Sequence, residues 1–87
     1  MENSWQQDFA QFLRKRDVPD RQIPYYVKWV SKFYSYNSQN IADLPDEVLK
    51  KEFLKDLGLM HEGWQVRQAD YALKLYQYFS YISTFLP

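Results

Sequence analysis

Apolar residues recur every three or four positions in the segment WQVRQADYALKLYQYFSYI, which covers residues 64–82. This spacing places them along one side of an α-helix, because an α-helix has about 3.6 residues per turn. The apolar positions are Ala69, Ala72, Leu73, Tyr76, Phe79 and Ile82. The first turns instead carry Gln65, Arg67 and Gln68. The pattern predicts a core-forming helix over residues 64–84 and raises the question of what its polar first turns contact.

Two shorter helical patterns precede it in the first half of the chain. The first covers residues 4–16 and begins at Ser4, whose hydroxyl suits the N-cap position. The second covers residues 20–36 and has Pro24 near its start. Because proline has no N–H to donate, we expect an irregular first turn there or a helix that begins nearer Gln22. The two apolar stripes are Trp5, Phe9, Phe12 and Leu13, and then Ile23, Tyr26, Val27, Val30, Phe33 and Tyr34.

A further pattern covers residues 45–57, with Pro45 in a position that suits a first helical turn. Its apolar stripe is Leu49, Phe53, Leu54 and Leu57. Gly58 follows directly, and we expect it to end the helix with a positive φ, which glycine adopts at little cost. Four amphipathic helices with short loops and no convincing strand predict an all-α fold. We expect one domain over residues 1–87, a compact four-helix bundle, either antiparallel or orthogonal.

The composition excludes several kinds of chemistry. The chain has no cysteine, which removes disulfides and thiolate metal sites, and its one histidine, His61, is expected to be a solvated loop residue. It has no glycine-rich phosphate loop and no zinc-binding histidine pattern. We therefore expect no catalytic residue, no metal, no cofactor and no enzymatic activity of the chain by itself. Its apolar runs are far shorter than the roughly 20 residues of a membrane span, so we expect no membrane partner.

The basic residues are more informative than the overall charge. Eleven basic and eleven acidic residues give a net charge of zero, which argues against binding nucleic acid by bulk charge but leaves room for a local basic face. Arg21 and Lys28 lie on the second predicted helix, and Arg67 and Lys74 lie seven residues apart on one face of the fourth. Such cations neutralise phosphates, and glutamine amides can bind base edges. The same residues are also ordinary on a solvated helix face, so spacing alone leaves both interpretations open.

The order of the motifs resembles a known family. FLRKRDVPDRQIPYYVKWVSKFYSY resembles the first half of the N-terminal core-binding domain of tyrosine recombinases, the phage and integron integrases. In that domain a helix ends in a short loop, and the next helix carries a tyrosine, an apolar residue and a phenylalanine, here Tyr26, Val30 and Phe33. LPDEVLKKEFLKDLGL is similar to its third helix and WQVRQADYALKLYQYF to its fourth. The resemblance covers about residues 9–79 and implies a SAM-like helical bundle.

The resemblance also implies a function. Such domains clamp the double-stranded DNA of a recombination site, together with a C-terminal catalytic domain of the same protein and with sister protomers. The implied DNA-binding residues are Arg21, Gln22, Tyr25, Lys28, Gln65, Arg67, Gln68, Tyr71 and Lys74. The family's catalytic residues lie in the separate domain, so the chain is expected to be the non-catalytic N-terminal part. We expect it to be monomeric when isolated and to act in the cytoplasm, on the nucleoid, as a bacterial or phage-encoded protein.

A protein-interaction domain is the alternative. In that case exposed aromatic side chains would form a patch for a partner protein, and association would hardly depend on salt. The residues expected in this patch are Trp29, Tyr34, Tyr78 and Tyr81. Membrane-surface binding is disfavoured, because no helix combines a strong basic face with a broad apolar one.

Overall fold

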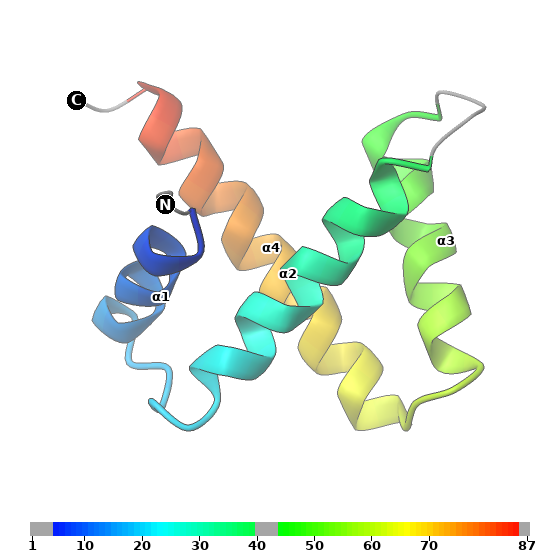
Figure 1. Ribbon diagram of the computed structural model, residues 1–87, viewed down its shortest axis with the longest axis horizontal. Helices are drawn as coiled ribbons and strands as arrows, with labels where there is room; N and C mark the ends of the chain where they lie inside the picture. Colours follow the sequence, from blue (N-terminus) through cyan, green and yellow to red (C-terminus); the bar gives the residue numbers. More distant parts are fainter. Residues whose placement is uncertain (1–4, 40–43, 86–87) are drawn as a thin grey trace.

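Two long helices cross near their middles, and a shorter helix packs on each side of the crossing (Figure 1). In this computed structural model, which describes residues 5–39 and 44–85, the helices are α1 (Trp5–Lys15), α2 (Ile23–Asn37), α3 (Asp46–Gly58) and α4 (Gly63–Phe85). The described residues contain no strand, so the predicted all-α class with four helices is confirmed. The helices α2 and α4 diverge below the crossing, where both begin, and this divergence shapes the surface discussed below.

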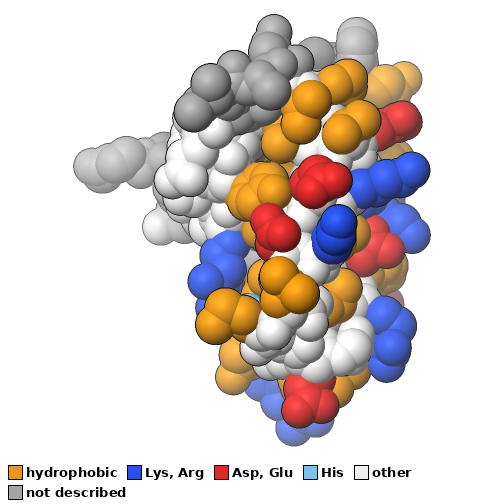
Figure 2. Space-filling model, turned by 90° about the vertical axis from the view of Figure 1, so that its right-hand side faces the viewer, with side chains coloured by type: hydrophobic (Ala, Val, Ile, Leu, Met, Phe, Trp, Pro, Cys, Tyr) orange, Lys and Arg blue, Asp and Glu red, His pale blue; other side chains and the backbone are white. Residues whose placement is uncertain are grey.

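The outer face of α3 carries charges of both signs. Figure 2 shows acidic and basic side chains interspersed there, with hydrophobic side chains between them. Lys50 of α3 lies 3.3 Å from a carboxylate oxygen of Asp70 on α4, and this ion pair helps to join the two helices. In the described residues, no helix combines the length and the apolar character that crossing a membrane requires.

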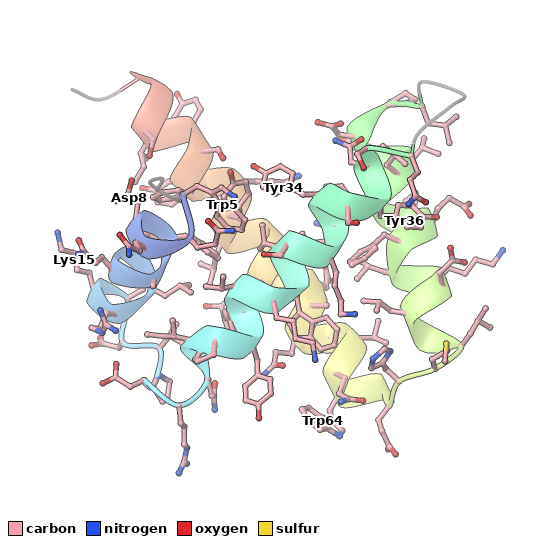
Figure 3. All side chains as sticks on the ribbon, in the orientation of Figure 1. Trp5, Asp8, Lys15, Tyr34, Tyr36 and Trp64 are labelled. Carbon is pink, nitrogen blue, oxygen red and sulfur yellow. The ribbon has the colours of Figure 1, made fainter. Side chains whose placement is uncertain are left out.

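Aromatic rings attach α1 to the crossing helices. The ring of Trp5 lies edge-on to Tyr34 of α2 and to Tyr76 of α4, with centroid distances of 5.2 and 5.3 Å. Figure 3 shows Trp5 and Tyr34 pointing toward one another. At the other end of α1, the guanidinium of Arg16 lies 5.1 Å from the ring of Phe12 and 4.7 Å from that of Tyr78. Each such edge-on or cation–π contact stabilises by about 0.5–1.5 kcal/mol, so several act together to hold this short helix.

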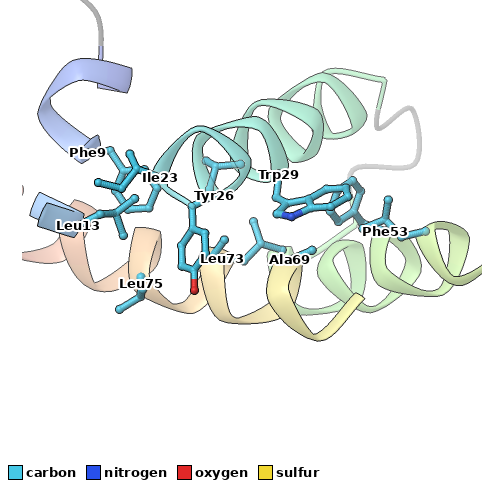
Figure 4. Close-up of a cluster of buried hydrophobic side chains, with 12 residues drawn as sticks. Phe9, Leu13, Ile23, Tyr26, Trp29, Phe53, Ala69, Leu73 and Leu75 are labelled. Carbon is cyan, nitrogen blue, oxygen red and sulfur yellow. The ribbon is translucent and has the colours of Figure 1, made fainter. Parts of the chain in front are cut away.

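The core is deepest where α2 meets α4. Ala69 and Ala72 are fully buried, and their small side chains let the two helix backbones approach closely. Trp29 and Leu73 lie close to Ala69 (Figure 4), and Val30 is also fully buried. All four predicted apolar stripes have buried members, which are Phe9 and Leu13, then Ile23, Tyr26 and Val30, then Leu49, Phe53 and Leu57, and finally Ala69, Ala72 and Leu73.

Trp29 is a correction to the sequence-based interpretation. The sequence suggests an exposed aromatic residue at this position, yet Trp29 is only 2% exposed. The reason is that α2 is covered from two directions, by α4 and by α3, so its buried face is wider than a single stripe. Tyr34, Tyr78 and Tyr81 are exposed, as the protein-interaction alternative expects. For Tyr34 this corrects the other expectation, that it belongs to the apolar stripe of the second helix, since it is 39% exposed.

The ends of the helices can be compared with those expected from the sequence. Pro24 lies in the first turn of α2, which begins at Ile23, so the expected late start is confirmed. The proposed cap at Ser4 lies outside the described residues. The expected positive φ at Gly58 is wrong: Gly58 is the last helical residue, and no described glycine has a positive φ. The helix closes instead through hydrogen bonds from the backbone N–H of Leu59 to Asp56 and of Met60 to Leu57.

A left-handed residue occurs at the end of α1 instead. Asp17 has a φ of 67°. Its N–H donates to the carbonyl of Arg14, and the N–H of Val18 donates to that of Leu13, which is the hydrogen-bond pattern of a Schellman motif. Aspartate accepts this conformation better than most residues, because its short polar side chain can hydrogen-bond locally. Val18 packs against the core beside it, so the turn directs the chain back toward the bundle.

The conformation of Gly58 gives a test. A Cβ at Gly58 would meet no atom within 4 Å, and the backbone there is helical. We expect Gly58→Ala to raise the free energy of unfolding by about 0.5–1 kcal/mol, because alanine has the higher helix propensity and less freedom in the unfolded chain. Urea denaturation followed by circular dichroism measures the change. Asp17→Ala is the counterpart and should lower stability, because alanine at a positive φ is strained. A destabilised Gly58→Ala would contradict this helix end.

Candidate nucleic-acid interface

Below the crossing, the N-terminal halves of α2 and α4 form the two sides of a surface groove, which we call the α2–α4 groove. Its volume is about 470 Å³. The lining residues are Arg21, Gln22, Tyr25, Lys28, Trp29, Trp64, Gln65 and Gln68. Six of these are DNA-binding residues predicted from the sequence, and the structure brings them together from two segments about 40 positions apart. Trp64 extends from the first turn of α4 at the lower edge of the molecule (Figure 3).

Gln65 caps the helix to which it belongs. Its Oε1 accepts a hydrogen bond from the backbone N–H of Glu62 at 2.9 Å, just before α4 begins. A glutamine in the first turn that reaches back to the N-cap N–H is one half of a capping box. The amide therefore satisfies one of the N–H groups that a helix start leaves without an intrahelical acceptor.

Gln68 holds the buried tryptophan. The indole Nε1–H of Trp29 donates to its Oε1 at 2.9 Å, across the junction of α2 and α4. A buried indole N–H needs an acceptor, because leaving it unpaired costs about 1–3 kcal/mol. The two glutamines therefore have structural partners, and these explain part of the polar character of the first turns of α4.

Both hydrogen bonds also fix which end of each amide is in use. In each case the donor is an N–H, so the side-chain oxygen of the glutamine must be the acceptor. The NH₂ group of each amide is then the end that can donate to a ligand. Arg21 and Lys28 can only donate, and no acidic side chain lines the groove. The groove is thus rich in donors and positively charged, although the chain is neutral overall.

Two acidic residues outside the lining, Asp20 and Glu62, lie close in the chain to groove residues. Asp20 precedes Arg21 in the chain, and its carboxylate pairs with the Nε of Arg14 at 3.1 Å. Glu62 precedes α4 and is exposed. Within the groove, the Nζ of Lys28 lies over the ring of Trp29, 5.4 Å from its centroid, which is a cation–π contact.

The remaining three predicted residues, Arg67, Tyr71 and Lys74, do not line the groove. At about 100° per residue, Lys74 is turned about 180° from Gln65 and about 120° from Gln68 around the axis of α4. Its Nζ pairs with Asp70 at 3.6 Å, and Asp70 also binds Lys50 of α3. Lys74 therefore does not share the groove with Arg21 and Lys28, and its contact with a duplex stays a prediction. Sequence spacing shows that Arg67 and Lys74 share a face, but not where that face points.

Arg67 and Tyr71 have neighbours of their own. An Nη of Arg67 lies 3.4 Å from the place where a Cβ would stand on Gly63, so this side chain folds back along α4. The ring of Tyr71 lies edge-on to the buried Tyr26, with a centroid distance of 6.1 Å. Burial, with a smaller contribution from Tyr71, raises the pKa of the Tyr26 hydroxyl above its ordinary value.

Two groove residues are not identified by the sequence. Trp29 and Trp64 line the groove, but neither is among the predicted DNA-binding residues. Trp64 is a large aromatic residue outside the apolar stripe of its helix, and that position is the available signal. No sequence signal places Trp29 under Gln68, because their contact joins positions 39 apart.

His61 is a further correction. The sequence predicts a solvated residue, but His61 is only partly exposed, and its ring lies edge-on to Trp29 at a centroid distance of 5.4 Å. Its Nδ1 lies 3.2 Å from the carbonyl oxygen of Leu57. The short loop between α3 and α4 brings it onto the core. Among the described residues, no three histidine, cysteine, aspartate or glutamate side chains are grouped so that they could hold a metal ion.

Comparison of the chain with protein-family models, with curated proteins and with solved structures gives no match in any of the three. Functional inference therefore depends on the residues and geometry described above.

The bond between Trp29 and Gln68 can be tested by removing its acceptor. We expect Gln68→Met to lower the free energy of unfolding by about 1–3 kcal/mol, because the volume is nearly kept while the buried indole N–H no longer has a partner. Chemical denaturation measures the change, and the indole N–H resonance of Trp29 should shift by NMR. Gln77→Met, at an exposed position of the same helix, is the control and should change stability by less than about 0.5 kcal/mol. A Gln68→Met protein as stable as the wild type would show that this bond contributes little.

Proposed function

We propose that the chain is a DNA-binding domain similar to the SAM-like core-binding domain of tyrosine recombinases. In this proposal it grips the duplex of a recombination site for DNA integration or recombination. A catalytic domain of the same protein would lie on the other side of the DNA, and sister protomers would complete the assembly. The observation that carries the proposal is the α2–α4 groove, which gathers six polar, cationic or aromatic residues expected on other grounds to contact DNA.

The geometry supports one side of the domain as the contact surface. Arg21 and Lys28 lie one on each side of Tyr25 in the chain, and both line the groove. The duplex would meet these cations through its phosphates, while the amide groups contact backbone or base edges. Lys74 does not line the groove and pairs with Asp70 instead. The proposal therefore places the DNA on the groove side.

The zero net charge of the chain limits the expected affinity for duplex DNA. Few cations face the groove, so the domain alone should bind duplex DNA in the range of about 10⁻⁴–10⁻⁶ M that non-specific binders show at physiological salt. Tight binding would need the catalytic domain and neighbouring protomers, as the proposed clamp implies. The isolated domain is proposed to be a monomer in the cytoplasm that associates with the nucleoid when bound.

One observation favours a protein-interaction domain as the second candidate. Leu59 and Met60, in the loop between α3 and α4, are 80% and 84% exposed. Two adjacent apolar side chains exposed to this degree are typical of a contact with a partner protein. Because Trp29 belongs to the core and not to an exposed aromatic patch, this loop is the better support for the second candidate.

Salt-dependent titration with duplex DNA tests the proposed function. We expect the wild-type chain to bind more weakly as salt rises, and Arg21→Ala/Lys28→Ala to reduce the magnitude of the log–log slope by about 1.8, that is about 0.9 for each phosphate that is no longer neutralised. Fluorescence anisotropy of a labelled duplex of about 20 base pairs gives the affinity at each salt concentration. Circular dichroism checks that helicity is retained.

The control removes the same charge elsewhere. Lys51→Ala/Lys55→Ala takes two exposed lysines from α3, four residues apart, and should leave the slope unchanged. Arg67→Ala/Lys74→Ala removes two cations of α4 that do not line the groove and should have a smaller effect than Arg21→Ala/Lys28→Ala. Equal reductions for all three double variants would indicate binding by diffuse charge, and the α2–α4 groove would not be the interface. No salt-dependent binding at all would favour the protein-interaction domain.

A further inference from the structure

The α2–α4 groove has aromatic walls as well as cationic ones. Tyr25 on α2 and Trp64 on α4 are 54% and 56% exposed, and Trp29 forms part of the lining between the two helices. The core of the bundle uses neither Tyr25 nor Trp64. Two half-exposed aromatic rings beside two cations provide flat surfaces on which a planar group can stack.

The polar groups of the groove restrict the ligand further. The oxygens of Gln65 and Gln68 already accept hydrogen bonds from Glu62 and Trp29, so their NH₂ groups are directed to donation. With Arg21 and Lys28, these groups match a ligand that is anionic and rich in acceptors. The volume of about 470 Å³ lies within the range of about 300–1,000 Å³ that is typical of small-ligand sites.

An intact duplex uses these features poorly. Its bases are stacked inside, so its phosphates meet Arg21 and Lys28 while the aromatic rings stay without a stacking partner. An unpaired nucleotide offers a phosphate, a planar base and keto oxygens together, and aromatic stacking with cationic contacts is the usual mode of single-strand binding. Acidic peptides also carry negative charge, but they lack a planar acceptor-bearing ring in each unit.

We propose that the α2–α4 groove binds an unpaired nucleotide of single-stranded DNA, with the base stacked on Trp64 or Tyr25 and the phosphate at Arg21 and Lys28. This inference rests on the proposed function, since it takes DNA as the ligand. It adds that the groove binds single-stranded DNA in preference to duplex DNA. We expect thymine to be preferred over adenine, because thymine offers two keto acceptors, O2 and O4, whereas adenine has no keto oxygen and presents an amino donor on its edge.

The test compares single-stranded and duplex DNA on the full 87-residue chain. Anisotropy titrations at one salt concentration use labelled oligo(dT), oligo(dA) and a hairpin duplex with the same number of phosphates. We expect oligo(dT) to bind about tenfold more tightly than the hairpin, as stacking of one base would provide. Oligo(dA) should bind more weakly than oligo(dT). Oligo(U) and oligo(dU), which differ only in the 2′-hydroxyl, show in two further titrations whether the sugar matters, and a strong preference for oligo(U) would overturn the assignment to DNA.

Single substitutions test whether Trp64 and Tyr25 stack on the base. Trp64→Ala should weaken oligo(dT) binding about tenfold and leave hairpin binding within twofold, and Tyr25→Ala tests the second wall in the same way. Tyr81→Ala removes a comparably exposed aromatic ring far along α4 and should change neither. Circular dichroism of each variant confirms folding. If oligo(dT) binds no better than the hairpin, or if neither Trp64→Ala nor Tyr25→Ala weakens oligo(dT) selectively, the inference is overturned.

The outcomes separate this inference from the proposed function. Hairpin binding that depends on Arg21 and Lys28, without a preference for oligo(dT), overturns the single-strand site and keeps the duplex clamp. Oligo(dT) binding that depends on Trp64, without measurable hairpin binding, supports the single-strand site and overturns the clamp. Absence of both kinds of binding overturns both.

Discussion

The hydrogen bond between the Trp29 indole and the Gln68 amide joins α2 to α4 at their buried junction. Both residues also line the α2–α4 groove. Trp29 is almost completely buried, and its N–H finds its acceptor on the other long helix. Ala69 and Ala72 beside it allow the close approach that this bond requires. The relative position of the two helices is therefore set by a packed ring, two small residues and one polar contact. Because Trp29 and Gln68 are part of the groove lining, the shape of the groove depends on the same contact.

The helices are predictable from the sequence because their physical causes are local. Helical spacing of apolar residues identifies all four helices, and Pro24 correctly indicates a late start for α2. Gly58 shows the limit of a local rule. Glycine tolerates a positive φ but does not require it, and the chain places its left-handed residue at Asp17 instead. That choice depends on Val18 packing onto the core, which is a tertiary contact.

The candidate site is only half predictable for the same reason. Residues on α2 and α4 can be assigned to outer faces, but the crossing of the helices decides which outer faces meet. It joins Arg21, Lys28 and the two glutamines, and it leaves Lys74 outside the groove, paired with Asp70. The burial of Trp29 and the contact of His61 with it also arise from this crossing. Periodicity carries no information on crossing geometry, since it describes each helix by itself.

The two groove glutamines have structural and binding roles at once, and this affects how function can be dissected. Each uses its oxygen within the fold and has its NH₂ group for a ligand. Replacing Gln68 would disturb Trp29, and replacing Gln65 would weaken the start of α4, so weaker DNA binding in either variant would have two explanations. Arg21, Lys28 and Trp64 are all exposed at the groove, and none of them belongs to the buried core. Variants of these three residues can therefore separate phosphate contact from base stacking while the junction of α2 and α4 stays intact.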